Sequence, residues 1–259
     1  MTRVGKSSNL KILFDDADLV AVEKPAGLAT IPGRDEPASV LHDLAAQLNI
    51  PASGTRDPRL RVVHRLDKDT SGVLLFAKNS PAQRFLSEQF QNNAIQKEYL
   101  AIVIGRPGAD EGTIDAPLAP HPSNPKRMTV LKHGRRARTD WKVEQKFRHY
   151  ALLRVFPRTG KTHQIRVHLA HIGLPLAVDL LYNSPLNPDA ALPAGVFLSQ
   201  FKRDYRPNRG QQERPLIGRL TLHAEKLRFK HPNGTEMTIE CPPPKDFRAT
   251  IAQLQKSAR

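Results

Sequence analysis

The sequence predicts an α/β protein in which strands outnumber helices. Three observations support this fold class: short apolar runs bounded by turn residues, amphipathic segments with helical spacing, and a Pro-Asn-Gly turn at 232–234 between two alternating segments, which is typical of a β-hairpin. The chain has 259 residues, which suits one large domain or two small ones.

The first elements are two short strands around a turn at residues 15–18, and Pro25 ends the second strand. A helix with Ser39 as its N-cap is expected next, because apolar residues recur with helical spacing. The residues on its apolar face are Val40, Leu41, Leu44, Ala45 and Leu48. Val73–Ala77 then has the continuous apolar character of a buried strand.

A second helix is expected after Val73–Ala77, with Ser80 as its N-cap and Pro81 at its first position. Its inward-facing residues are expected to be Phe85, Leu86 and Phe90. Lys97–Gly105 follows as a strand.

The second half of the chain is expected to contain a hairpin formed by Trp141–Phe147 and Ala151–Phe156. A helix over 162–173 follows, which ends at Gly173. The residues on its buried side are expected to be Ile165, Leu169 and Ile172. Residues 184–215 are rich in Pro, Asn, Arg and Gln and predict a long insertion or loop.

The formal net charge of +15 and the isoelectric point near 10.2 predict a polyanionic partner. The N-terminus lacks the apolar stretch of a signal peptide, and no run of about 18 apolar residues occurs, so we expect no membrane segment. A single cysteine, Cys241, fits a reducing compartment. We therefore expect a soluble, cytoplasmic protein that binds nucleic acid.

The positive charge is concentrated in Lys126–Arg148, which holds nine Lys or Arg against two acidic residues. Within it, Arg135, Arg136 and Arg138 are the expected contacts to a phosphate backbone. Lys202–Arg219 forms a second basic run. The alternative is that each run is only a well-solvated surface.

The segment Arg61–Lys78 places two carboxylates, Asp67 and Asp69, among Arg65, Lys68 and Lys78 and next to a very apolar run. Nearby cations favour the ionised form of a carboxylate, which suits a nucleophile or base held at the end of a rigid strand. The alternative for Asp67 is a structural salt bridge or a turn. We expect Asp69 to help form a turn that consists of Thr70, Ser71 and Gly72.

No cofactor motif is complete. Arg158–Thr162 resembles the end of a phosphate-binding loop, but Val155 stands where its first glycine is needed. Three histidines, at positions 163, 168 and 171, lack Cys or acidic partners at suitable spacing for zinc. We therefore expect neither a metal nor a cofactor.

The stretch His64–Lys78 resembles the H-R-L-D-x-x-T-S-G signature of the RluA family of pseudouridine synthases. Four further blocks are similar to that family and occur in family order. They are Asp15–Gly33, Gln96–Gly105, Arg158–Tyr182 and Leu222–Pro232. The chain departs from the family where Val178-Asp179-Leu-Leu-Tyr182-Asn183 replaces G-D-x-x-Y-G, and in the segment 184–215.

The resemblance implies an α+β fold with a mixed, largely antiparallel sheet flanked by helices. It implies one catalytic domain over residues 1–259, with a cleft between its two halves. About ten residues precede the first strand, so we expect no separate N-terminal RNA-binding module. We expect a monomer.

The resemblance also implies residue roles. Asp67 corresponds to the catalytic aspartate, Tyr99 to the tyrosine that stacks on the target uracil, and Arg166 to the arginine that pairs with the aspartate. Arg65 corresponds to the arginine that fills the gap left by the flipped nucleotide, and Leu222 would line the base pocket.

The implied activity is isomerisation of a uridine in ribosomal or transfer RNA by base flipping, with no cofactor. Two alternatives remain open from the sequence. The first is an inactive RNA-binding or ribosome-assembly protein on the same fold. The second is a metal-dependent nuclease that uses Asp67, Asp69 and the histidines.

Overall fold

A computed structural model of the chain describes residues 9–33, 37–52, 59–183, 195–202, 205 and 212–257. Two compact units are present, and each combines two separate stretches of the chain. Unit 1 comprises 1–96 and 224–241, and unit 2 comprises 97–223 and 242–259. Within the described ranges, no helix is both long and apolar enough to cross a membrane.

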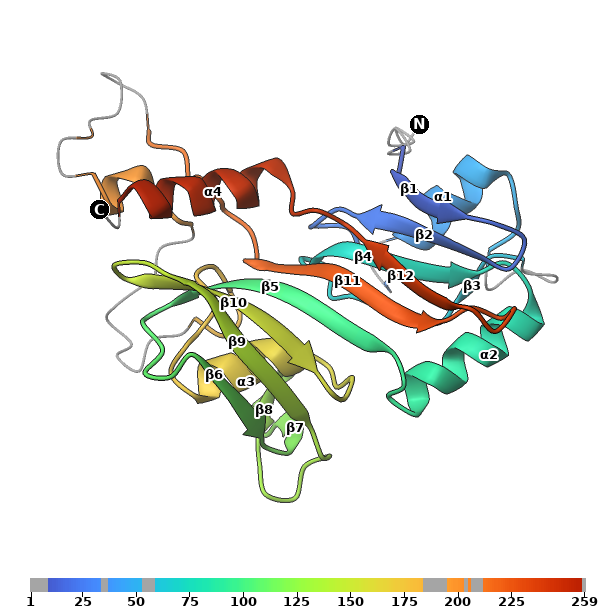
Figure 1. The fold of residues 1–259 in the computed structure, drawn as a ribbon, viewed down its shortest axis with the longest axis horizontal. Coiled ribbons are helices and arrows are strands. Elements are labelled where there is room, and N and C mark those ends of the chain that lie inside the picture. Colours follow the sequence, from blue (N-terminus) through green and yellow to red (C-terminus); the bar gives the residue numbers. More distant parts are fainter. Residues whose placement is uncertain are drawn as a thin grey trace. The chain divides into compact units, whose positions relative to one another are not determined.

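Unit 1 is built on strands in the order β1-β2-β4-β11, with β3 also paired to β4 and β12 to β11 (Figure 1). Its elements are β1 (Ile12–Asp15), β2 (Leu19–Lys24), α1 (Val40–Leu48), β3 (Arg61–Val62), β4 (Ser71–Ala77), α2 (Ser80–Gln91), β11 (Leu222–Lys230) and β12 (Glu236–Glu240). All seven residues of β4 are buried. This strand therefore forms the centre of the unit 1 core, as its apolar sequence predicts.

The start of β4 lies in close contact with β11. Gly72 has φ +124°, and a Cβ at this position would lie 2.1 Å from the carbonyl oxygen of Ala224. Only glycine fits both the backbone conformation and the contact. The residue that the sequence places in a turn thus allows two strands to approach.

Unit 2 has strands in the order β5-β10-β9-β6 and a separate two-stranded pair, β7-β8. Its elements are β5 (Gln96–Ile104), β6 (Glu111–Asp115), β7 (Leu118–His121), β8 (Asn124–Val130), β9 (Arg138–Lys146), β10 (Tyr150–Pro157), α3 (Gln164–His171), the 3-10 turn η1 (Leu198–Gln200) and α4 (Lys245–Lys256). Ile165 and Leu169 of α3 pack with Val103 and Leu153 in one core cluster. Phe247 and Leu254 of α4 pack in another.

The pairings β1–β2, β2–β4, β5–β10, β9–β10, β6–β9, β7–β8 and β11–β12 are antiparallel. The predicted α+β fold with a largely antiparallel sheet is therefore confirmed. The predicted hairpin at 141–156 and the hairpin predicted around the turn at 232–234 are also present.

Two predicted details of the helices are wrong. The N-cap of α2 is Asn79 rather than Ser80, because the Asn79 side chain accepts a hydrogen bond from the Ala82 amide at 2.8 Å. In α3, the helix ends at His171, so Ile172 falls outside it and is 37% exposed. Most of the expected insertion at 184–215 lies outside the described residues, although Val196 pairs with Ile217.

Candidate active site

Asp67 lies on a turn that leads directly into β4 in unit 1. The Thr70 amide donates to the Asp67 carbonyl at 3.1 Å and closes this turn. The turn therefore spans Asp67–Thr70, not Thr70–Gly72 as expected, because Ser71 and Gly72 already belong to β4. Asp67 is half-buried, whereas Asp69 is exposed. This difference in burial favours Asp67 for chemistry.

Leu66, the residue before Asp67, has both its backbone carbonyl and its backbone amide hydrogen-bonded to one side chain. The hydroxyl of Thr30 donates a hydrogen bond to the Leu66 carbonyl at 3.0 Å, and the Thr30 hydroxyl oxygen accepts one from the Leu66 amide at 3.2 Å. Both residues are buried, so water does not compete for these hydrogen bonds. The backbone immediately before Asp67 is thereby fixed.

The residue after Asp67 is held by Lys24, the last residue of β2. This lysine is fully buried, and its Nζ donates to the carbonyls of Pro25, Leu28 and Lys68 at 2.7, 2.6 and 2.7 Å. The Gly27 amide also donates to the Lys68 carbonyl, at 2.9 Å. A buried cation requires such partners, since an unpaired one is very costly. We did not predict this role from the sequence, although a lysine two residues after the apolar run Leu19–Val22, in the same strand, was a signal.

His64 ties the same segment to β4 and α2. Its Nε2 accepts a hydrogen bond from the Leu75 amide at 2.9 Å, so the hydrogen of the neutral ring is on Nδ1. The ring stacks on Phe90 of α2, with centroids 4.4 Å apart. Contacts on both sides of Asp67 therefore hold it in a fixed loop.

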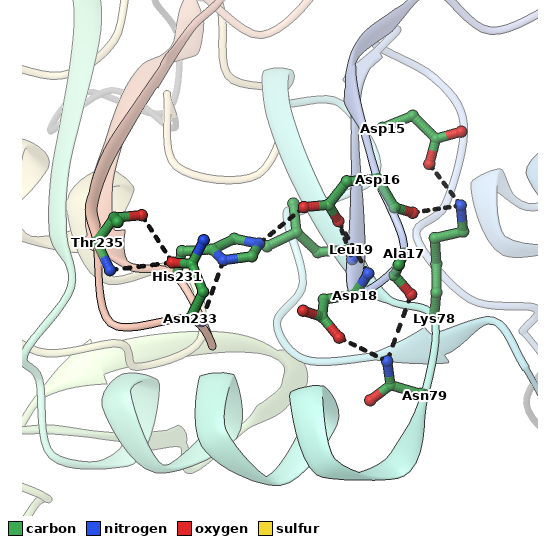
Figure 2. A network of polar contacts seen from close by, with 10 residues as sticks. All are labelled: Asp15, Asp16, Ala17, Asp18, Leu19, Lys78, Asn79, His231, Asn233 and Thr235. Atoms are coloured by element: carbon green, nitrogen blue, oxygen red, sulfur yellow. Dashed lines mark hydrogen bonds and ion pairs between the residues drawn. The ribbon is translucent and has the colours of Figure 1, made fainter.

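Lys78, which was expected near Asp67, lies at the opposite end of β4. Its Nζ contacts Asp15 at 2.8 Å and the Asp16 carbonyl at 2.6 Å (Figure 2). The expectation that Lys78 belongs to the cations around Asp67 is therefore wrong. Arg65 and Lys68 remain next to Asp67 in the chain, and both are exposed.

The network in Figure 2 fixes the β1–β2 turn instead. Asp16 accepts from the amides of Asp18 and Leu19, both at 2.9 Å, and His231 Nε2 lies 2.9 Å from its other oxygen. Burial alone would raise the pKa of Asp16, but these hydrogen bonds and the nearby His231 hold it below the ordinary value. This acidic turn is a structural feature of unit 1.

Tyr99 and Leu222 share one apolar environment in unit 2, because the first two residues of β11, Leu222 and His223, belong to unit 2 and the rest of the strand to unit 1. Tyr99 is half-buried on β5, opposite Val155 of β10. It packs against the core cluster that contains Leu222, which is 3% exposed. The Tyr99 side chain is therefore supported by the core and still partly accessible.

Arg166 lies on α3 and forms a buried ion pair with Asp179. Its Nε donates to Oδ2 and its Nη2 to Oδ1, both at 2.8 Å, in a bidentate geometry. The two side chains are 8% and 1% exposed. The expected pairing of Arg166 with Asp67 stays a prediction. The role of Asp179 was not predicted, although Asp179 matches the Asp of the G-D-x-x-Y-G pattern, from which the chain departs at Val178 and Asn183.

The histidines considered as zinc ligands include one with a clear structural role. His168 is buried, with Nδ1 2.8 Å from the Thr139 hydroxyl and Nε2 2.9 Å from the Ala116 carbonyl. Burial lowers its pKa and favours the neutral ring. No group of three His, Cys, Asp or Glu within the described ranges could hold a metal ion.

The basic residues Arg135, Arg136 and Arg138 are exposed at the start of β9 and the loop before it. The loop backbone is fixed, because Arg135 and Leu118 exchange two backbone hydrogen bonds of 2.8 and 2.9 Å. Arg138 also pairs with Asp140 at 3.3 Å. Burial opposes the ionised form of Asp140, but hydrogen bonds from Arg158, Thr113 and Arg138 hold its pKa below the ordinary value. Arg138 is therefore partly neutralised.

The chain is similar to known proteins in both sequence and structure. A family model described as RNA pseudouridylate synthase matches residues 18–171. "Ribosomal large subunit pseudouridine synthase D" of Nitrosomonas europaea is 38% identical over 247 residues, which is 95% of this chain and 65% of that protein. The Escherichia coli protein of the same name is 37% identical over 248 residues, which is 95% of this chain and 71% of that protein. The chain thus spans about two thirds of the length of these relatives.

Among solved structures, human RNA pseudouridylate synthase domain containing 4 is similar, with a TM-score of 0.71 and 28% identity. The match covers 95% of this chain and 93% of the human one. Human RNA pseudouridylate synthase domain containing 1, with a TM-score of 0.69 and 22% identity, shares the fold.

Proposed function

Because the chain belongs to the RNA pseudouridylate synthase family, we propose that it isomerises a uridine in RNA to pseudouridine, with Asp67 as its catalytic carboxylate. The observation that carries this proposal is the support around Asp67. Leu66 is fixed by Thr30, and Lys68 is fixed by Lys24. A reacting carboxylate must be held within a fraction of an ångström, and such flanking contacts do this.

The reaction requires three events. The N1–C1′ bond of uridine breaks, the uracil turns, and C5 joins C1′. The proton that leaves C5 is balanced by a proton taken up at N1. A carboxylate can act as a nucleophile at C1′ or C6, or as a base toward the ribose; glycosidases use carboxylates at the same type of bond. None of these routes requires a metal or a redox cofactor.

The remaining residues have roles that follow from flipping a base. Flipping a uridine out of its stack costs a few kcal/mol of stacking and pairing free energy. Stacking on an aromatic side chain and a wedge residue in the gap offset part of this cost. We assign Tyr99 as the platform, Leu222 as a pocket wall and Arg65 as the residue that fills the gap in the RNA. We assign Arg166 as the partner of Asp67, and propose that both units form one catalytic domain over residues 1–259.

The names of the relatives support ribosomal RNA of the large subunit as the substrate. A net charge of +15 supports an RNA partner as well. With this substrate, we expect a cytoplasmic monomer.

The test is tritium release from large-subunit ribosomal RNA that carries [5-³H]uridine and comes from cells without this gene. Asp67→Asn should abolish release while RNA affinity, measured by filter binding, stays within a few-fold. Asp69→Asn is the matched control, because Asp69 lies two residues further along the same turn and is exposed; this variant should retain most of the activity. Turnover by purified Asp67→Asn would refute the assignment.

The same assay separates the two alternatives. An inactive RNA-binding protein would bind this RNA but release no tritium even as the wild type. A metal-dependent nuclease would lose activity in EDTA and regain it with Mg²⁺, whereas we expect full activity in the chelator.

A further inference from the structure

Lys97 is a half-buried lysine on the face of β5 that α3 covers. Alternate residues of a strand point to the same side of its sheet. Tyr99 packs against the core cluster that includes residues of α3, and Lys97 stands two residues before it in β5. The Nζ of Lys97 donates a hydrogen bond of 3.2 Å to the carbonyl of Thr159, in the loop before α3. Lys97 and Tyr99 are therefore neighbours on one face of the strand.

The partners of Lys97 do not balance its charge. An ammonium group has three N–H donors, and the described part of the chain supplies one acceptor, the Thr159 carbonyl. The nearby carboxylates are engaged by arginines: Glu98, on the other side of β5, pairs with Arg154, and Asp140 of β9 pairs with Arg138 and Arg158. Burial of a cation without an anionic partner is costly, so this position favours an anion supplied by a ligand.

A second positive charge, that of Lys161, lies close to Lys97. Burial, and then the charge of Lys161, lowers the pKa of Lys97 to about 8. Lys161 is half-buried, and within the described ranges its side chain forms no ion pair either. Two like charges repel each other, so an anion that contacts both lysines would stabilise both.

The loop that carries Lys161 is fixed by Gln164, a buried residue at the start of α3. The Oε1 of Gln164 accepts hydrogen bonds from the Lys161 amide at 3.0 Å and from the Thr159 hydroxyl at 2.7 Å. Between these two residues, Gly160 leaves room beside the ammonium group, because a Cβ there would lie 3.8 Å from the Nζ of Lys97. The segment is the one whose sequence resembles the end of a phosphate-binding loop.

We infer that Lys97 and Lys161 form a phosphate-binding subsite, and that its occupant is a backbone phosphate of the RNA strand whose target uridine stacks on Tyr99. A phosphate supplies the negative charge and the acceptor oxygens that the two ammonium groups need, and lysine is a common phosphate ligand. Residues two apart on a strand are separated by about 7 Å, so the phosphate would belong to the target nucleotide or to a neighbouring one. The inference rests on the proposed function, which gives RNA as the partner and Tyr99 as the platform.

The first test is the salt dependence of RNA binding. Wild type, the two single variants Lys97→Met and Lys161→Met, and the double variant would be compared by filter binding to large-subunit ribosomal RNA at several salt concentrations. We expect each single variant to bind about tenfold more weakly, as for loss of a hydrogen bond to a charged group. Because the two lysines share one phosphate, the double variant should flatten the slope of log K against log salt by about 0.7–0.9, the contribution of one contact.

A matched control removes two exposed lysines from α4 in the same unit, at Lys245 and Lys256. Its salt slope should match that of the wild type. Equal flattening in this control would mean that only the general charge had changed, and would overturn the subsite. An unchanged slope in the Lys97 and Lys161 double variant would do the same. A change of about 1.4–1.8 would mean two separate phosphates and would overturn the shared site.

Stability separates RNA binding from a structural role of Lys97. Lys97→Met removes a half-buried charge that has one hydrogen bond, so at neutral pH we expect its free energy of unfolding in urea to be at least that of the wild type. A variant that is stable but binds RNA weakly supports the subsite. A variant that unfolds more easily and binds RNA as the wild type does would assign Lys97 to the fold instead.

Inorganic phosphate distinguishes the two possible sources of the anion. If the subsite takes free phosphate, adding phosphate at constant ionic strength should raise the melting temperature of the wild type but not that of Lys97→Met, and the two proteins should bind RNA equally well. That result would overturn the assignment to an RNA phosphate. We expect instead that the RNA affinities of the two proteins differ.

These outcomes are distinct from failure of the proposed function. A wild type that binds this RNA but releases no tritium would refute the isomerisation, and the salt slopes would still test the subsite. An active wild type whose RNA affinity and salt slope are unaffected by the double substitution would refute the subsite alone.

Discussion

The Nζ of Lys24 donates a hydrogen bond of 2.7 Å to the main-chain carbonyl of Lys68, the residue after Asp67. A lysine at the end of one strand thus holds the turn that carries the proposed catalytic carboxylate. The same Nζ binds two carbonyls of the loop that follows its own strand.

Lys24→Met should lower both stability and turnover. The change leaves three carbonyls without their charged donor, and hydrogen bonds to charged groups contribute about 1.5–3 kcal/mol each, so we expect a loss of at least about 2 kcal/mol. Urea unfolding and tritium release would measure the two effects. Lys11→Met is the control, because Lys11 pairs with Glu23 on the surface, where such pairs contribute about 0–1 kcal/mol. Equal stability of the two variants would contradict this role of Lys24.

Tyr99→Phe should bind and convert RNA nearly as well as the wild type, because the stacking face is kept. Tyr99→Ala should lose about 1–3 kcal/mol, the contribution of one stacked base, seen as a lower kcat/KM. Tyr150→Ala on β10 controls for lost packing, since Tyr150 is also half-buried in unit 2. If Tyr150→Ala reduced kcat/KM as much, stacking by Tyr99 would not be the cause.

Replacing Arg135, Arg136 and Arg138 together with Ala should flatten the dependence of RNA affinity on salt. Each phosphate contact contributes about 0.7–0.9 to the slope of log K against log salt. Three contacts would contribute about 2.1–2.7 units and two contacts about 1.4–1.8. We expect a change just under two units, because Arg138 is already paired with Asp140. Turnover on saturating RNA should be nearly intact.

A control for that variant removes the same number of exposed cations elsewhere, at Arg228, Lys230 and Arg248. Its salt slope should match the wild type. An unchanged slope in the Arg135, Arg136 and Arg138 variant would show that this surface is only solvated, and would leave the described part of Lys202–Arg219 as the next candidate. Arg219 would then be a poor choice, because it pairs with Asp246.

Lys97 should make stability depend on pH. Burial, and then the positive charge of Lys161, lowers the pKa of Lys97 from 10.5 to about 8. Below about pH 8 both folded and unfolded chains hold this proton. Between about pH 8 and pH 10.5 the unfolded chain binds this proton more strongly than the folded chain does. The free energy of unfolding should therefore rise with pH over that window.

Lys97→Met should abolish this rise and stabilise the protein at neutral pH. Lys161→Met removes the repulsion alone and should shift the rise to higher pH. Urea unfolding at several pH values would measure both effects. If the free energy of unfolding still rose with pH in Lys97→Met, another titrating group would be responsible for the rise.

Local sequence patterns predicted the main strands and helices, but they could not decide which of two neighbouring residues is the N-cap of a helix. Asn79 and Ser80 are both good N-caps for α2. Asn79 is also held by Asp18, a residue 61 positions away, through a hydrogen bond of 2.8 Å. Such a contact depends on the tertiary fold and is invisible in a short window of sequence.

Elements with weaker apolar signals were not predicted at all. The strands β7 and β8 contain Pro120 and Pro125, which argue against a strand, and β3 has only two residues. Helix α4 could have been found, since Phe247, Thr250 and Leu254 recur with helical spacing and are buried.

Some residues of the candidate site could be predicted from the sequence and others could not. Asp67, Tyr99 and Arg166 could be named because they lie in recognisable blocks of sequence. Lys24 and Asp179 could not be assigned roles, because their partners are brought close only by folding. Hydrogen-bonding partners of buried charges are set by the tertiary structure, so the supports of a site are harder to predict than its reacting groups.

The split composition of unit 1 has a consequence for how the chain is made. Strand β4 ends at Ala77, but its neighbour β11 begins only at Leu222. At a synthesis rate of about 5–20 residues per second, roughly seven to thirty seconds pass between the synthesis of the most apolar strand of the unit and that of its partner. During this interval only the short strand β3 can pair with β4 at Phe76 and Ala77 on the side away from β2, so we expect the rest of that edge to be open to chaperones and other chains. We therefore expect the yield of folded protein to depend on the speed of translation between these two strands as well as on the stability of the finished fold.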